Sequence, residues 1–206
     1  MIDSKLIKLI IQDLTKFYKS PIVLNLTDHI FATSYRAGLL SDVDVQGGLV
    51  LEFGVFSGTS IQQIQSIYNK HVYGFDSWMG LPESDGYFKK GEFDCKGKQP
   101  EINNKNITLI DGWFEDTLPK FAEEHPGPVQ FINFDADLYS STKTIFNNLK
   151  DRFVRGTVMY FDEYKLYPDW EDREYRAFLE FIHETGFGYE YICRTENEER
   201  CAIILV

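Results

Sequence analysis

Two pairs of acidic residues follow apolar segments that have strand character. Asp135 and Asp137 follow a run that begins at Val129, and Asp162 and Glu163 follow a second run. If the runs form consecutive parallel strands, all four carboxylates meet at the sheet edge where ligands bind, and they raise one another's pKa unless a cation holds them. Oxygen ligands without His or Cys select Mg²⁺ or Ca²⁺, and Mg²⁺ would acidify a hydroxyl that it binds. The alternative is a set of independent helix caps and solvated turn acids.

A second candidate site follows an earlier strand-like run. That run carries Glu52 and ends in a turn with Gly54 and Gly58, after which the spacing becomes helical. Glycines let the backbone approach a ligand, and the amides of the helix favour a negative group. A carboxylate beside helix amides suits the methionine end of S-adenosylmethionine (SAM), which carries an ammonium and a carboxylate. The pattern lacks the G-x-G-x-x-G of dinucleotide-binding folds. The alternative is a turn that only lets strand and helix pack.

The next two predicted strands also end in polar groups. Asp76 closes the strand from His71 and would accept both hydroxyls of an adenosine ribose, or would only start the following turn. Asp111, Gly112 and Trp113 follow the third strand and place an acid, a close backbone and an aromatic ring at the same edge. They form a plausible adenine slot, with Trp113 as a plain core residue as the alternative.

The composition limits the classes of function. A chain of 206 residues is long enough for one domain, and the net charge of −11 disfavours nucleic acid and anionic membranes as partners. We find no signal peptide or membrane-spanning run, which predicts a cytoplasmic protein. Cys95, Cys193 and Cys201 lack zinc or disulfide spacing, and we expect reduced thiols.

The remaining elements complete an alternating α/β pattern. Helices are expected at 4–19 and 27–40, within an N-terminal helical cap over 1–46 that covers the cleft or meets a second subunit as a homo-oligomer. Residues 77–105 are irregular and contain apolar side chains, which predicts a lid. Later helices are expected at 59–69, 115–124 and 171–185, and a hairpin formed by 187–194 and 201–206 closes the chain.

Five strings of sequence together resemble the macrocin O-methyltransferase family of class I SAM-dependent methyltransferases. They are E-F-G-V-F-S-G-T-S from Glu52, G-F-D-S-W-M-G-L-P-E from Gly74, G-W-F-E-D-T-L-P from Gly112, D-A-D-L-Y-S-S-T from Asp135 and F-D-E-Y from Phe161. The resemblance implies a Rossmann-like fold with a mostly parallel seven-stranded sheet, helices on both faces and an antiparallel last strand. It also implies Mg²⁺ and SAM as cofactors.

The resemblance assigns roles to individual residues. Glu52, Gly54 and Gly58 would hold the methionine end of SAM and Asp76 the ribose. The predicted metal ligands are Asp137, Asp162 and Glu163, where Glu163 stands in place of the family's usual second Asp. The full predicted cofactor set is Glu52, Gly54, Phe56, Ser57, Gly58, Thr59, Ser60, Asp76, Ser77, Asp111, Gly112, Trp113 and Asp135.

A proton acceptor is harder to assign, because the lid contains no His. The hypotheses are Asp85 in the lid, or Asp135 after acidification by a metal bound through Asp137. The implied function is Mg²⁺-dependent O-methylation of a small-molecule hydroxyl on a sugar or another natural-product scaffold. The alternatives are oxygenase-like chemistry on the same fold, or a SAM-binding partner protein without catalysis.

Overall fold

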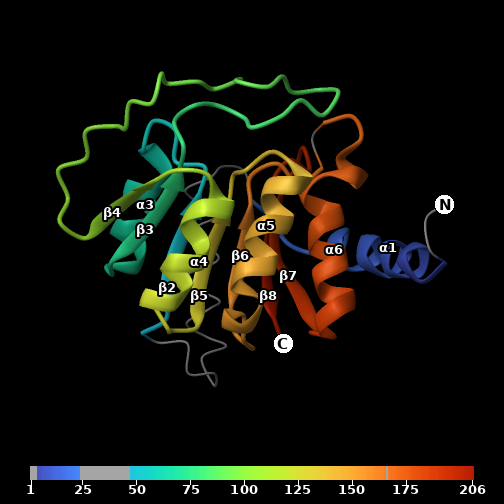
Figure 1. Ribbon diagram of the computed structural model, residues 1–206. Helices are drawn as coiled ribbons and strands as arrows, with labels where there is room; N and C mark the ends of the chain where they lie inside the picture. Colours follow the sequence, from blue (N-terminus) through green and yellow to red (C-terminus); the bar gives the residue numbers. More distant parts are fainter. Residues whose placement is uncertain (1–3, 24–46, 166) are drawn as a thin grey trace.

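The computed structural model describes residues 4–23, 47–165 and 167–206. The helix expected at 27–40 lies outside the described residues. Within them, a single sheet of eight strands carries helices on both faces (Figure 1). None of the described helices has the length and apolar character needed to cross a membrane.

Five parallel strands lie next to one another in the sheet, from β6 (Val158–Phe161) to the edge strand β4 (Ile107–Asp111). In chain order they are β2 (Leu49–Phe53), β3 (Val72–Asp76), β4, β5 (Val129–Phe134) and β6. Strand β8 (Cys201–Leu205) lies antiparallel between β6 and β7 (Tyr189–Thr195), in the order β1-β7-β8-β6-β5-β2-β3-β4. The predicted seven strands and the antiparallel last strand are confirmed. The two-residue edge strand β1 (Ile22–Val23) pairs with β7 and is too short to recognise from sequence.

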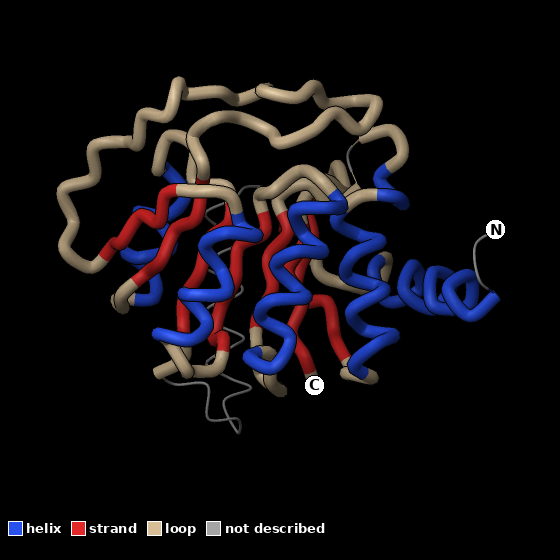
Figure 2. The backbone as a smooth tube through the Cα atoms, viewed as in Figure 1, coloured by secondary structure: helices blue, strands red, loops and turns tan. Residues whose placement is uncertain are grey.

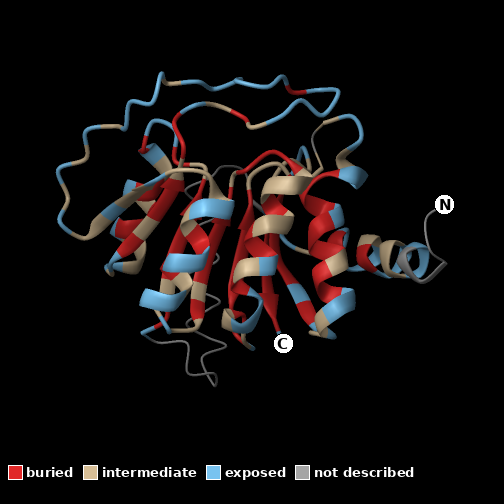
Figure 3. Ribbon diagram, viewed as in Figure 1, coloured by how far each residue is buried: buried red, intermediate tan, exposed pale blue. Residues whose placement is uncertain are grey.

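Helices cover the sheet unequally. Helix α3 (Thr59–Tyr68) lies on one face, and α4 (Phe114–Glu124), α5 (Tyr139–Leu149) and α6 (Glu174–Thr185) lie on the other (Figure 1). Short 3₁₀ turns occur at η1 (Lys150–Arg152) and η2 (Trp170–Asp172). Because β2, β5 and β6 lie inside the sheet and are covered on both sides, they are almost continuously apolar and buried, whereas the edge strand β4 has no fully buried residue (Figure 3).

Helix α1 (Ser4–Phe17) packs against α6 and β7 at one end of the molecule (Figure 1). Its buried Asp13 accepts hydrogen bonds from the hydroxyls of Tyr189 and Tyr191, and Phe17 is fully buried. The hydroxyl of Tyr191 also bonds to that of Tyr164, 2.6 Å away. The tyrosine of the Asp-Glu-Tyr motif therefore belongs to the packing that holds α1.

Cys193 and Cys201 lie on adjacent strands, but their register is offset. Cys193 pairs with Ala202, and Cys201 pairs with Arg194. The two cysteines pack into clusters on opposite faces of the sheet. No bridge between them is formed, as the sequence predicted.

The segment over 77–105 contains neither helix nor strand and passes above the carboxyl ends of the strands (Figure 2). Most of it is exposed (Figure 3). Trp78, Leu81 and Phe88 are buried. The indole Nε1 of Trp78 donates to the carbonyl of Phe56, and Phe88 packs in a small cluster with Leu138. These contacts attach the loop to the body, so we call residues 77–105 the lid.

Candidate active site

A cavity of about 250 Å³ lies under the lid, at the carboxyl ends of β2 to β5. Parallel strands direct their ends and following loops to this edge, which is why residues far apart in sequence meet here. The walls are apolar and aromatic except for a few carboxylates and hydroxyls. The described residues of α1 do not line the cavity, so this part of the predicted N-terminal cap lies elsewhere.

The glycine turn after β2 brings its backbone against the loop after β5. Gly54 has φ +87°, and a Cβ at this position would lie 1.7 Å from the carbonyl oxygen of Asp135. Its amide donates to Phe75, and the amide of Asp135 donates to Phe53. A side chain at position 54 is therefore excluded both by its backbone conformation and by space.

Asp76 organises the same turn. Its Oδ2 accepts the amides of Val55 and Phe56 at 2.9 and 2.8 Å, and its Oδ1 accepts the amide of Trp78 at 2.7 Å. One carboxylate thus joins the glycine turn to the start of the lid. Asp76 also lines the cavity, where the sequence predicted a ribose-binding acid.

Glu52 lies below the cavity and does not line it. The side chain is fully buried on β2 and accepts hydrogen bonds from Asn133, at 2.9 Å, and from Ser60. Burial raises the pKa of Glu52 to about 8, so the carboxyl is largely protonated at neutral pH. Its Oε2 has no partner. In this structure Glu52 and Ser60 fasten β2 to α3.

The other predicted cofactor residues divide into two groups. Those that line the cavity are Gly54, Phe56, Asp76, Ser77, Gly112, Trp113 and Asp135. Ser57, Gly58, Thr59 and Asp111 do not line it. Gly58, with φ +77°, begins α3, and a Cβ there would lie 2.7 Å from the lid residue Ile102. It therefore allows the lid to approach closely.

The acids after β5 and β6 form the opposite wall. Asp135, Asp137 and Glu163 line the cavity, and the carboxyl of Asp137 hydrogen-bonds to Glu163. Burial, reinforced by Glu163, raises the pKa of Asp137 to about 10, and burial also raises the pKa of Asp135 and Glu163. Asp137 has φ +60°, a left-handed conformation that Asp and Asn tolerate better than most residues. Burial and the neighbouring acids therefore favour the protonated, uncharged forms of these carboxyls.

Asp162 lies near these acids but has a different partner. Its Oδ1 lies 2.6 Å from Nε of Arg200, and it does not line the cavity. Among the described residues, no three acid, His or Cys side chains are arranged to hold a metal. The predicted ligands Asp137 and Glu163 are brought together, whereas Asp162 is paired with an arginine.

Asp85 is also placed differently from its predicted role as a base. Its Oδ2 lies 2.5 Å from Nη1 of Arg173, and its Oδ1 accepts the amides of Tyr87 and Phe88. The carboxylate is therefore occupied by a buried guanidinium and by lid amides, and it does not line the cavity. The contact attaches the lid to the start of α6.

Sequence reasoning missed three residues around the acids, Arg173, Glu174 and Arg200. Glu174 is fully buried, and its Oε1 accepts the amide of Ala136 at 3.2 Å, which fixes the loop between Asp135 and Asp137. Its pKa is raised by burial. All three lie outside the motifs, and no local spacing relates them to the acids, since the sheet pairing and the docking of α6 bring them close.

Comparison with known proteins places this geometry in a family. The model of a methyltransferase domain matches residues 51–164, more than half of the chain. The demethyldecarbamoylnovobiocin O-methyltransferase of Streptomyces niveus is 28% identical over 167 residues, which are 68% of this chain and 62% of the relative. The 8-demethyl-8-(2,3-dimethoxy-alpha-L-rhamnosyl)-tetracenomycin-C 4'-O-methyltransferase of Streptomyces olivaceus is 30% identical over 146 residues, 59% of this chain and 54% of the relative.

Both curated relatives are matched over less than two thirds of their length. Among solved structures, the calicheamicin methyltransferase CalS11 aligns with a TM-score of 0.64 and 17% identity, over 99% of this chain and 94% of that chain. At this identity the likeness supports the fold.

Proposed function

The chain belongs to the methyltransferase-domain family and has the class I fold, and on this premise we propose that it transfers the methyl group of SAM to a hydroxyl of a small molecule. The observation that carries the proposal is the composition of one cavity. Asp76 and Trp113 stand on one wall, and Asp135 and Asp137 stand on the other. A methyl donor and an acidic site for a hydroxyl can therefore meet under the lid.

The first wall fits an adenosine group. A carboxylate can accept about four hydrogen bonds, and Asp76 accepts three from backbone amides. One acceptor position therefore remains for a ribose hydroxyl. Trp113 and Phe114 supply aromatic surface for the adenine, and Gly54 lines the cavity where the methionine end would lie. This division of roles is a proposal that follows the predicted one, except that Glu52 acts beneath the site.

The chemistry needs little beyond placement. SAM supplies an activated methyl group whose sulfonium departs as a neutral thioether, so the protein must align the attacking oxygen and accept one proton. Asp135 and Asp137 line the cavity in which such a hydroxyl would bind, and the buried lid side chains Trp78 and Leu81 would exclude water. Because both acids have raised pKa values, they accept a proton only after losing their own.

A Mg²⁺ requirement is part of the proposal, although the residues fit the ion only in part. Asp137 and Glu163 supply hard oxygen donors side by side, as Mg²⁺ prefers. Mg²⁺ chemistry would lower the pKa of a bound hydroxyl. Asp162 as placed does not contribute a ligand, so we derive no step through the ion.

We propose a sugar or another natural-product scaffold as the acceptor, in a chain that acts in the cytoplasm. The curated relatives are named for novobiocin and for a rhamnosyl tetracenomycin. A net charge of −11 disfavours a polyphosphate acceptor such as nucleic acid.

Calorimetric titration with S-adenosylhomocysteine (SAH), with and without Mg²⁺, tests the proposal. Wild type should bind SAH, and Asp137→Asn should keep SAH binding while losing the heat of Mg²⁺ binding. Asn suits the left-handed backbone at this position better than Ala. Absence of SAH binding to the wild type would refute the proposal.

An acceptor screen completes the test. Glycosylated phenolic and polyketide compounds are offered with SAM, and the formation of SAH is measured with the mass of the product. A gain of one methyl group supports methyl transfer. An oxidised product would point to oxygenase-like chemistry, and SAH binding without turnover of any acceptor would favour the non-catalytic binding protein.

A further inference from the structure

Arg200 faces Asp162 because of the strand pairing. Phe161 on β6 pairs with Cys201 on β8, so the residues just beyond this pair lie opposite one another. Nε of Arg200 lies 2.6 Å from Oδ1 of Asp162, and Nη2 lies 3.4 Å from Oδ2. Both carboxylate oxygens therefore face the guanidinium, in a two-point contact with one short charge-assisted hydrogen bond and one longer one.

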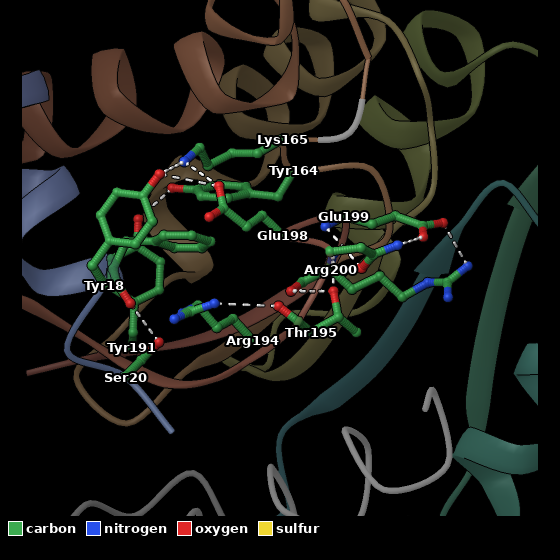
Figure 4. Close-up of polar contacts among 12 residues, drawn as sticks. Tyr18, Ser20, Tyr164, Lys165, Tyr191, Arg194, Thr195, Glu198, Glu199 and Arg200 are labelled. Carbon is green, nitrogen blue, oxygen red and sulfur yellow. Dashed lines mark hydrogen bonds and ion pairs between the residues drawn. The ribbon is translucent and has the colours of Figure 1, made fainter. Parts of the chain in front are cut away.

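The guanidinium is itself held in place. Its Nη2 lies 3.0 Å from Oε1 of Glu199, so Arg200 bridges two carboxylates. The backbone of Arg200 exchanges hydrogen bonds with Thr195 at the end of the β7–β8 hairpin (Figure 4). The same turn is tied down by Glu198, which accepts a hydrogen bond from Lys165 at 2.8 Å (Figure 4). These contacts fix the position of the Arg200 side chain at the start of β8.

This arrangement divides the acids that the sequence grouped together. Asp137 and Glu163 line the cavity, and Asp162 does not. We propose that Arg200 is the fixed counter-cation of Asp162, that it withdraws this carboxylate from the metal, and that it thereby sets the affinity of the site for Mg²⁺. The inference rests on the metal site of the proposed function, and it makes Arg200 a positioning residue.

Two effects give Arg200 this influence. Mg²⁺ can bind Asp162 only after the contact between Asp162 and Arg200 is broken, so the free energy of that contact is lost from Mg²⁺ binding. A loss of about 1.4 kcal/mol would weaken the Mg²⁺ affinity tenfold. The guanidinium also repels a divalent ion close to it. Removal of Arg200 should therefore release a third oxygen ligand and tighten Mg²⁺ binding.

The test is calorimetric Mg²⁺ titration of the full chain at constant ionic strength. Arg200→Gln should bind Mg²⁺ about tenfold or more tightly than wild type. The matched control is Arg176→Gln, because Arg176 also bridges two carboxylates, Asp172 and Glu180, on the exposed side of α6. It makes the same change in net charge, and its Mg²⁺ affinity should equal that of wild type.

Asp162→Asn supplies the second arm. In the wild-type background it should leave the Mg²⁺ affinity within about threefold, and in the Arg200→Gln background it should abolish the gain. Arg200→Gln with no gain over Arg176→Gln would overturn the inference. So would loss of Mg²⁺ binding in the single Asp162→Asn variant, because Asp162 would then be a ligand despite Arg200.

Two further measurements keep the outcome decisive. If circular dichroism shows that Arg200→Gln does not fold, Arg200→Met replaces it, since Met is a long, flexible side chain without a charge. Tighter Mg²⁺ binding by Arg200→Met supports the inference, and equal or weaker binding overturns it. SAH titration of the wild type without metal tests the methyltransferase proposal separately.

Discussion

The two sides of the cavity satisfy their carboxylates in different ways. At the end of β3, Asp76 accepts three backbone amides, two from the glycine turn after β2 and one from the start of the lid. At the ends of β5 and β6, Asp137 and Glu163 face each other, and burial raises their pKa values. The first side is organised before any ligand arrives, whereas the second needs a proton or a cation.

The contrast has a simple structural origin. Two of the amides that bond to Asp76, those of Val55 and Phe56, come from a turn in which Gly54 and Phe56 have positive φ, so successive N–H groups point at one carboxylate. The loop after β5 instead presents the carboxyls of Asp135 and Asp137, and Glu174 takes the amide between them. Amides organise one wall, and acids make up most of the polar groups of the other.

The largest effect is expected from breaking the amide-satisfied side. Asp76→Ala leaves the amides of Val55, Phe56 and Trp78 without their acceptor, so the free energy of unfolding should fall by about 2–4 kcal/mol. SAH affinity should fall by roughly 30-fold or more, the equivalent of about 2 kcal/mol. The matched control is Asp111→Asn, because this exposed acid pairs with Asp76 in the sheet register. Urea unfolding and SAH calorimetry measure both effects, and equal behaviour of the two variants would contradict the assignment.

Glu52→Gln should remove a pH dependence of stability. The pKa of Glu52 is about 8 in the folded chain against an ordinary 4.5, so the folded chain holds a proton that the unfolded chain has released. Its contribution therefore lowers the free energy of unfolding as the pH rises from about 4.5 to about 8, by about 1.4 kcal/mol per pKa unit at most. Urea unfolding at pH 5 and pH 8 should show a smaller loss in the variant. Equal losses in both proteins would rule out the raised pKa.

Two substitutions on the acid side should have opposite signs. Asp137→Asn relieves repulsion, donates an amide to Glu163 and keeps a tolerated left-handed backbone, so stability without metal should rise by about 1 kcal/mol. Asp162→Asn weakens the contact with Arg200 and should lower stability by about 1 kcal/mol. Thermal unfolding in chelator measures both. Changes of the same sign would mean that the acids form one equivalent cluster.

The smallest effect is expected where the lid meets α6. Asp85→Asn and Arg173→Gln should each weaken lid attachment, with a coupling of about 1 kcal/mol in the double variant. Limited proteolysis of the lid and SAH dissociation rates report its opening. Asp94→Asn is the control, because that carboxylate bonds to the amide of Lys96 within the same loop. If Asp85→Asn abolished turnover while Arg173→Gln kept it, Asp85 would be the base after all.

Most of the fold followed from local patterns. Apolar runs separated by helical spacing placed all seven principal strands, and the closing hairpin predicted the antiparallel β8. The expected ends of helices and strands differ from the observed ends by one to three residues. The first helix, for example, is expected over 4–19 and ends at Phe17. The edge strand β1 escaped prediction because two residues carry no period of their own.

The sequence by itself determined which residues reach the active edge, because the ends of parallel strands are fixed by the order of strands and turns. It therefore placed Asp76 and Asp137 on the cavity. Tertiary structure alone decided their partners. Arg200 and Asp162 are 38 residues apart in the sequence and meet because β6 pairs with β8. Arg173 meets Asp85 because the lid packs against the start of α6. Ion pairs depend on distances in space, and these distances cannot be read from local spacing in the sequence.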